Sequence, residues 1–334
     1  MGLTAITGVL SRYFIVGFFM PAYVALVGLW LSASRGFIPN TFARHSETTQ
    51  LLILGGVALV VALLLSGLSY PLTRTAEGYP LLGLRRWPVL RLVPRTAIAL
   101  QGRARRRLEV IRNDTRRPDA ERARAYAQLD KLFPCDPNRL LPTRLGNAMR
   151  AYEGHSNVRW GLDGVTIWPR IAALLSAEES DLLTDAEIDL RVFLNGAFAV
   201  AGVGACLIVD KVVHDPNGPR AWPLYVIPFI VAYLLYRASI GAAVRRGAVV
   251  RASIDLHRFD LYAKLGIRDP TSLSDERTLS VALCQFLLYG RPPLADDLWR
   301  GQSEAPQPDI GDEAPGNERD PRPWVAVLKE WIRR

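Results

Sequence analysis

The stretch LLILGGVALVVALLLSGLSY, residues 51–70, decides the fold class of this 334-residue chain. It contains no charged residue and no histidine. A helix of about 20 apolar residues can cross the hydrocarbon core of a bilayer, because its backbone groups are bonded internally. Three further uncharged runs occupy residues 13–31, 192–209 and 221–236. The pattern predicts an all-α integral membrane protein with four transmembrane helices in two hairpins and a mainly helical cytoplasmic region.

The last two runs are weaker than the first two. The third is rich in glycine and alanine, and the fourth is short and contains Pro223 and Pro228. Runs of this length also occur as buried helices of soluble proteins, so that alternative stays open for the second pair.

Charge predicts the orientation of the spans. Residues 71–190 carry 20 Lys and Arg, and residues 237–334 carry 15, whereas each connector within a hairpin carries two. Positive residues remain on the cytoplasmic side. We therefore expect both termini and the middle region in the cytoplasm. This topology largely explains the net charge of +9, and nucleic acid is not an expected partner, because no nucleic-acid-binding signature accompanies the charge.

These features divide the chain into five expected parts. They are a first transmembrane hairpin (1–72), a basic cytoplasmic helical region (73–190), a second hairpin (191–239), a cytoplasmic helical extension (240–300) and a flexible tail with a terminal amphipathic helix (301–334).

The most basic segment is Leu84–Arg112, with nine arginines and one acid, Glu109. Trp87 and several aliphatic residues alternate with the arginines, so the segment could lie on anionic headgroups of the inner leaflet. It could equally be a juxtamembrane stretch that only follows the charge rule. Candidate lipid or partner contacts are Arg85, Arg86, Arg103, Arg105, Arg106 and Arg107.

The third run predicts a helix-packing face. Ala197, Ala201 and Ala205 recur at a spacing of four, and small residues let helices approach closely. Asn195 is the only amide in the four runs, and it could either form an interhelical hydrogen bond or line an aqueous path together with Tyr233.

The helical pattern of the fourth run continues beyond it and predicts one helix from Leu224 to Leu265, about 60 Å long. Shorter helices are expected over residues 118–133 and from Pro142 onward. In the tail, Trp324 and Trp331 share one helical face, which could dock on a membrane, on a neighbouring subunit or on the same chain.

No catalytic, cofactor or metal signature is found. The three cysteines have no paired spacing, the four histidines are scattered, and the common nucleophile, phosphate-loop, dinucleotide and zinc-protease motifs do not occur. We therefore expect neither an enzyme nor a bound cofactor.

Three stretches carry a resemblance: LLPTRLGNAMRAYE at Leu140–Glu153, RWGLDGVTIWPR at Arg159–Arg170 and DLHRFDLYAKLG at Asp255–Gly266. They resemble a family of bacterial four-helix integral membrane proteins, of the kind common in actinobacteria, to which no activity is assigned. The resemblance implies a location in the bacterial inner membrane and no functional residues.

Two functions follow as hypotheses. The first is a homo-oligomeric channel or pore gated by its cytoplasmic region, one variant being an effector that permeabilises the inner membrane. The alternative is a membrane-anchored scaffold that recruits a cytoplasmic protein partner or anionic lipids. A closed ring of subunits would favour the pore, and a non-conducting monomer would favour the scaffold.

Overall fold

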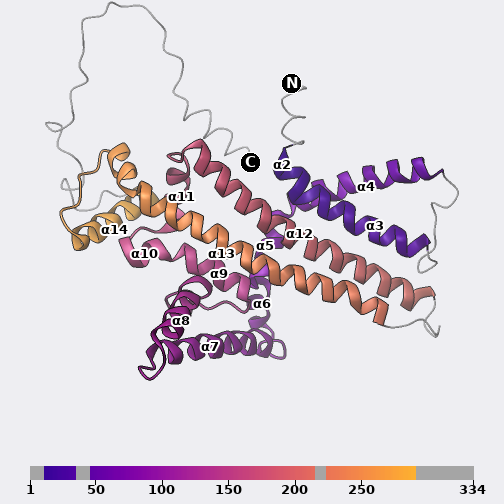
Figure 1. The fold of residues 1–334 in the computed structure, drawn as a ribbon, viewed down its shortest axis with the longest axis horizontal. Coiled ribbons are helices and arrows are strands. Elements are labelled where there is room, and N and C mark those ends of the chain that lie inside the picture. The colour runs from indigo at the N-terminus through magenta and orange to yellow at the C-terminus, as the bar shows by residue number, and fades with distance from the viewer. Residues whose placement is uncertain (1–10, 35–45, 215–222, 291–334) are drawn as a thin grey trace, which may run out of the picture. The chain divides into compact units, whose positions relative to one another are not determined.

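The computed structural model describes residues 11–34, 46–214 and 223–290, and every regular element in these ranges is a helix (Figure 1). The first half contains α2 (Arg12–Phe14), η1 (Ile15–Phe19), α3 (Met20–Ser34), α4 (Glu47–Gly67), α5 (Ser69–Glu77), α6 (Tyr79–Gly83), η2 (Leu84–Arg86), α7 (Leu92–Asn113) and α8 (Asp119–Leu132). The second half contains η3 (Pro137–Arg139), α9 (Arg144–Glu153), α10 (His155–Trp160), α11 (Gly164–Ala172), α12 (Ala177–His214), α13 (Pro223–Leu265) and α14 (Leu273–Tyr289).

Four helical segments are long and apolar enough to cross a membrane: Arg12–Leu31, Glu47–Gly67, Ala177–Val213 and Tyr225–Leu265. The all-α class is thus confirmed, and each of the four predicted runs falls in one of these segments. Helices α12 and α13 are much longer than their apolar runs, because the charged residues on the predicted cytoplasmic side continue the same helix.

The chain forms two compact units built from non-consecutive segments. Unit 1 comprises Met1–His155 and Glu178–Ala252, and unit 2 comprises Ser156–Ala177 and Ser253–Arg334. The predicted parts were consecutive, whereas helix α13 contributes to both units. The predicted tail at residues 301–334, with Trp324 and Trp331, lies outside the described residues.

In unit 1, the first two spans pack through aromatic and small residues. Phe14, Phe18 and Ala22 form a buried cluster with Ala62 of α4. The indole nitrogen of Trp30 donates to Gln50 Oε1 at 3.1 Å. Within the first span, residues 15–19 form a π-helical turn, a feature that the apolar run did not predict.

Helix α4 leads directly into those helices of unit 1 that are predicted to be cytoplasmic. Helix α4 ends at Gly67, α5 follows after Leu68, and Gly78 ends α5 in a left-handed conformation with φ of +89°. That φ is accessible to glycine without the steric cost of a Cβ atom. The turn places Glu77 at the end of α5 and lets the short helix α6 begin in a new direction.

The predicted local helices are close to those observed. The helix expected at residues 118–133 is α8, and the long helix expected from Leu224 to Leu265 is α13. The expectation that Pro142 opens a helix is wrong by two residues. Thr143 caps α9 instead, because its hydroxyl oxygen accepts a hydrogen bond from the Gly146 amide at 3.1 Å.

Candidate functional site

A half-buried charged layer lies where helices α5, α9 and α13 of unit 1 meet. We define it as Arg74 and Glu77 of α5, Arg150, Tyr152 and Glu153 of α9, and Arg246 of α13. Glu77 is only 6% exposed. Ionised groups are rarely buried to this extent unless they are paired, so the partners of each side chain define what the layer can do.

Glu77 is paired with the arginine one turn before it. Arg74 Nη1 lies 3.2 Å from Glu77 Oε2. The Arg74 guanidinium also lies 4.4 Å from the ring centroid of Tyr79 and 5.3 Å from that of Tyr70. Arg150 also approaches Tyr79, and its Nη2 atom donates to the Tyr79 hydroxyl at 3.4 Å. Two arginines therefore share the aromatic ring of Tyr79, a favourable cation–π arrangement.

Tyr152 links α9 to α13. Its ring is fully buried against Gly247, where an added Cβ would lie 2.6 Å from Tyr152 Cδ1. The Arg246 guanidinium donates to the Tyr152 hydroxyl, while its Nε atom is buried with no hydrogen-bond partner among the described residues. The close approach at Gly247 thus holds a half-buried arginine and a buried tyrosine together.

Burial also controls protonation in this layer. Burial raises the pKa of the Glu77 carboxyl. The positive charge of Arg74 lowers this pKa, and the negative charge of Glu153 raises it further. Burial likewise raises the pKa of Glu153, against the lowering effects of Arg74 and Arg150. The pKa of Tyr152 is raised by burial to about 12. The arrangement can therefore hold a proton on a carboxyl at a higher pH than an exposed glutamate can.

We expect the stability of unit 1 to fall with rising pH through these carboxyls. A carboxyl with a raised folded-state pKa contributes fully below its unfolded pKa of about 4.3, and its contribution is lost as the pH rises through the folded value. Glu77→Gln should therefore lose less thermal stability than the parent as the pH rises above the unfolded-state pKa of about 4.3. Thermal unfolding in detergent over this range measures the difference. Glu121→Gln, at an exposed glutamate of α8, should follow the parent, and so would Glu77→Gln if the idea is wrong.

The residues predicted in the third span have separate surroundings. Asn195 is 1% exposed, and its Nδ2 atom donates to the Gly17 carbonyl at 2.7 Å. This is an interhelical hydrogen bond, and the acceptor lies within the π-helical turn. Ala197 is buried, Ala201 is half-buried and Ala205 is exposed. Tyr233 on α13 is 58% exposed.

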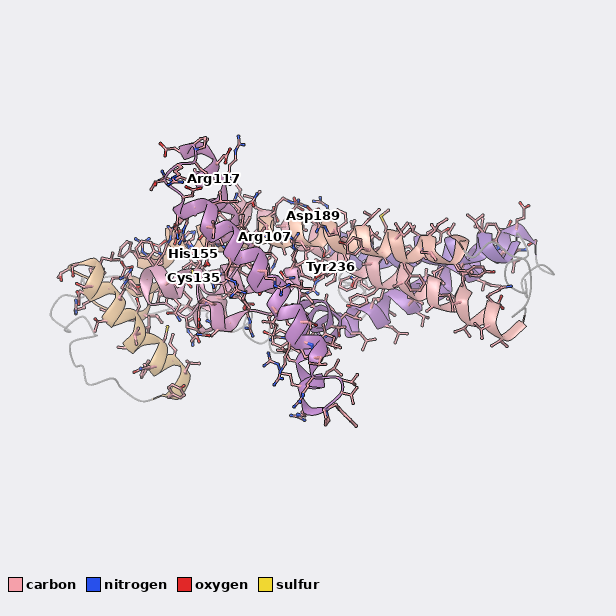
Figure 2. All side chains as sticks on the ribbon, turned by 90° about the horizontal axis from the view of Figure 1, so that it is seen from below. Arg107, Arg117, Cys135, His155, Asp189 and Tyr236 are labelled. Carbon is pink, nitrogen blue, oxygen red and sulfur yellow. The ribbon has the colours of Figure 1, made fainter. Side chains whose placement is uncertain are left out.

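Two glycines of α12, which stand beside the predicted alanines in the sequence, approach α13 closely. An added Cβ on Gly204 would lie 2.8 Å from Phe229 Cε2 and 3.0 Å from Pro228 Cβ. At Gly196 the nearest atom would be Leu235 Cδ1 at 3.4 Å. Further toward the predicted cytoplasmic side, Arg245 of α13 pairs with Asp189 of α12 at 2.8 Å, the latter labelled in Figure 2.

Replacing Asn195 with leucine should destabilise the packing of the first and third spans by about 0.6–2 kcal/mol, as measured for interhelical hydrogen bonds in membranes. The leucine cannot donate to the Gly17 carbonyl, so that oxygen loses its side-chain partner. Unfolding in mixed detergent micelles gives the free energy. Val209→Leu, on an exposed part of the same helix, is the control and should change it by less than about 0.5 kcal/mol. Equal behaviour of the two variants would contradict the assignment.

The predicted arginine contacts divide into two groups. Arg85, Arg86, Arg103, Arg106 and Arg107 are exposed, and Figure 2 shows Arg107 on α7 and Arg117 in the turn that follows. Arg105 is different, since it is largely buried, pairs with Glu109 at 3.1 Å and donates to the Cys135 carbonyl at 2.9 Å. Arg105 therefore fixes the packing of unit 1 and is not available as a surface contact.

A second buried network lies in unit 2 and joins two of the quoted sequence stretches. The Trp160 indole donates to Asp255 Oδ1 at 2.7 Å, and the Arg258 guanidinium lies 4.0 Å from the Trp160 ring centroid. Arg258 Nε lies 2.9 Å from Glu276 Oε1 on α14. Each of these groups has a partner, so the network is a structural element that ties α10, α13 and α14 together.

Sequence reasoning missed the half-buried charged layer. Glu77 is the only acid between Glu47 and Glu109, and a single carboxylate placed shortly after a span was the available signal. The packing of α5 against α9 could not be read from the sequence, because Glu77 and the facing residue Gly146 are about 70 residues apart. No group of three or more potential metal ligands occurs in the described ranges.

The fold and these sites were compared with known proteins. No protein-family model, no curated protein and no solved structure matches the chain.

Proposed function

We propose that this chain is a membrane-anchored scaffold that recruits an acidic protein partner to the exposed arginines of α7. Two hairpins of spans anchor it in a bacterial inner membrane, with both termini in the cytoplasm. The location follows from the charge distribution and from the family resemblance, which itself stays a prediction.

The observation that carries the proposal is the contrast between two sets of arginines. Arg74, Arg105, Arg251 and Arg258 are paired with internal carboxylates. Arg103, Arg106 and Arg107 are exposed within one turn of α7, and no carboxylate in the described ranges pairs with them. Unpaired charges of one sign produce a positive potential that attracts and orients an acidic surface.

Charge reversal tests this proposal in the full-length chain. We would place the protein in nanodiscs of zwitterionic lipid, which removes attraction to anionic lipid, and measure binding of a fluorescent poly-glutamate peptide as the probe. Arg103→Glu, Arg106→Glu and Arg107→Glu together should weaken binding at least about tenfold, and added salt should weaken the parent.

The control carries the same net charge change at other exposed basic residues of unit 1: Arg124→Glu, Lys131→Glu and Arg144→Glu. It should bind the peptide within about twofold of the parent if the α7 arginines form a local site. Equal losses in both triple variants would mean that only net charge matters, and the proposal would be withdrawn.

A homo-oligomeric channel is the second candidate, and one observation favours it. Gly202, Ala205 and Cys206 are exposed on α12, within the third span. Small residues on an outward face allow a second helix to approach closely. Asn195 gives less support, because its amide already donates to Gly17.

Native mass spectrometry and cysteine cross-linking test the channel. Oxidation of a Cys135→Ser variant should produce dimers through Cys206 if α12 lies at a symmetric interface, and Cys206→Ser should abolish them. A closed oligomer of defined mass would then justify recordings in planar bilayers. A monomer by mass, with no cross-linking, would rule out a path shared between subunits.

A further inference from the structure

The predicted cytoplasmic region displays apolar side chains to solvent in an unusual place, residues 84–95, which run from η2 into the first turn of α7. We call it the Trp87 segment. Trp87 is 65% exposed and Val89 is 83% exposed, and three more large apolar residues are exposed beside them: Leu90, Leu92 and Val93. A contiguous apolar surface outside the spans indicates an interaction site.

The backbone of this segment is ordered by its own hydrogen bonds. The Trp87 amide donates to the Leu84 carbonyl at 3.1 Å, the Arg91 amide to the Trp87 carbonyl at 2.9 Å, and the Val93 amide to the Leu90 carbonyl at 3.1 Å. Pro88 lacks an amide hydrogen altogether. Several backbone donors are thus satisfied internally, which an apolar environment requires.

Charge identifies the partner. Four arginines of the Trp87 segment are exposed, namely Arg85, Arg86, Arg91 and Arg95. No Asp or Glu occurs from Gly78 to Leu108. Arginine alternating with tryptophan and aliphatic residues is the composition of segments that lie in the interface of an anionic bilayer, with rings and aliphatic groups among the acyl chains and guanidinium groups on phosphates.

Chain connectivity brings the segment near such a surface. It begins 17 residues after the end of α4, and α5 and α6 fill most of that interval. Helix α5 has 9 residues, a length of about 13 Å. The segment is therefore tethered close to the leaflet that its own chain enters, which gives the lipid a high effective concentration.

We propose that the Trp87 segment docks on anionic phospholipid headgroups at the cytoplasmic face of the membrane that the same chain spans. The acyl interface receives Trp87, Val89 and Leu90, and the headgroups receive the flanking arginines. The inference does not depend on the scaffold proposal, because it uses residues 84–95, whereas recruitment uses Arg103, Arg106 and Arg107.

A label in the segment tests this directly. In a Cys135→Ser, Cys206→Ser background, Val89→Cys is labelled with an environment-sensitive fluorophore, and the full chain is placed in nanodiscs. We expect quenching by nitroxide-labelled lipid in discs that contain phosphatidylglycerol, and much less in discs of phosphatidylcholine alone. The control is Val110→Cys, an exposed apolar position near the C-terminal end of α7, where no lipid quenching is expected.

Two variants separate the contributions. Trp87→Ala should reduce lipid quenching in both kinds of disc. Arg85→Gln with Arg91→Gln should reduce the advantage of phosphatidylglycerol, by about fivefold for each arginine. Quenching at residue 89 no greater than at residue 110, or equal in the two lipids, would overturn the proposal. A label that stays accessible to aqueous iodide in both discs would also overturn it and would leave the surface to a protein partner.

Discussion

Replacing Gly146 with alanine is expected to destabilise unit 1 by about 1–3 kcal/mol, the range for overpacking a filled core. An added Cβ at Gly146 would lie 2.3 Å from the Glu77 carbonyl oxygen and 2.8 Å from Leu141 Cδ1. Contacts this short cannot be relieved by rotating a flexible side chain, because the nearer atom belongs to the backbone of α5. Either α5 or α9 must move, and the Arg74–Glu77 pair lies at that junction.

The neighbouring groups leave little room for adjustment. Asn147, the next residue of α9, is fully buried, and its side chain bonds the Leu141 amide at 2.8 Å and the Leu141 carbonyl at 2.9 Å. Asn147 therefore holds Leu141 against α9, and α9 is the helix that the methyl group of the Gly146→Ala variant would push away. Relaxation on one side of Gly146 would break hydrogen bonds on the other.

The matched control is Gly102→Ala, the same substitution in helix α7. Its added Cβ would meet only Leu140 Cδ1 at 3.8 Å and Arg106 Nη2 at 3.9 Å. Alanine favours helix over glycine by about 0.5–1 kcal/mol, so this variant should gain stability. Unfolding in detergent followed by circular dichroism gives both values. If the two variants changed stability in the same direction, the close packing of α9 on Glu77 would be incorrect.

The helices themselves could be predicted from sequence because their signals are local. Charge-free runs gave the spans, and an apolar stripe with a period near 3.6 gave α13 within one residue of its observed start. The acid-rich segment 178–189, which precedes the third run, belongs to the same helix α12. Acidic residues near a helix N-terminus are favourable, so the continuation has a physical reason that composition alone did not reveal.

The candidate sites were less predictable because they depend on contacts between distant segments. Spacing favoured Ala197, Ala201 and Ala205, but the face of α12 that meets α13 depends on helix rotation, and on that face Gly196 and Gly204 approach α13 closely. Asn195 was identified as the only amide in the four runs, and an interhelical hydrogen bond was one of its two expected roles. Its acceptor, the Gly17 carbonyl, lies 178 residues away in the chain. The exposed arginines and Trp87 could be identified without knowing any long-range contact, because a segment rich in arginine and tryptophan is recognisable from its composition.

The second large effect is expected in unit 2, where Arg258→Met should destabilise the fold by about 3–5 kcal/mol, as for removal of one partner from a buried ion pair. The Arg258 side chain is 16% exposed and Glu276 is 6% exposed. Methionine fills similar volume but leaves the Glu276 carboxylate buried without its cation. It also removes the guanidinium from the faces of Trp160 and Phe259, whose ring centroids lie 4.0 Å and 4.3 Å away.

A double variant separates the charge effect from the packing effect. Arg258→Met with Glu276→Leu removes both charges, and because well-packed apolar pairs often replace buried ion pairs without loss, it should recover most of the stability. The exposed pair of Arg117 and Glu121 is the control, and Arg117→Met there should change stability by less than about 1 kcal/mol. Hydrogen exchange of the α14 amides reports unit 2 separately from the spans. If the double variant were no more stable than Arg258→Met alone, the loss would come from the cation–π contacts with Trp160 and Phe259, and the buried charge of Glu276 would not be its cause.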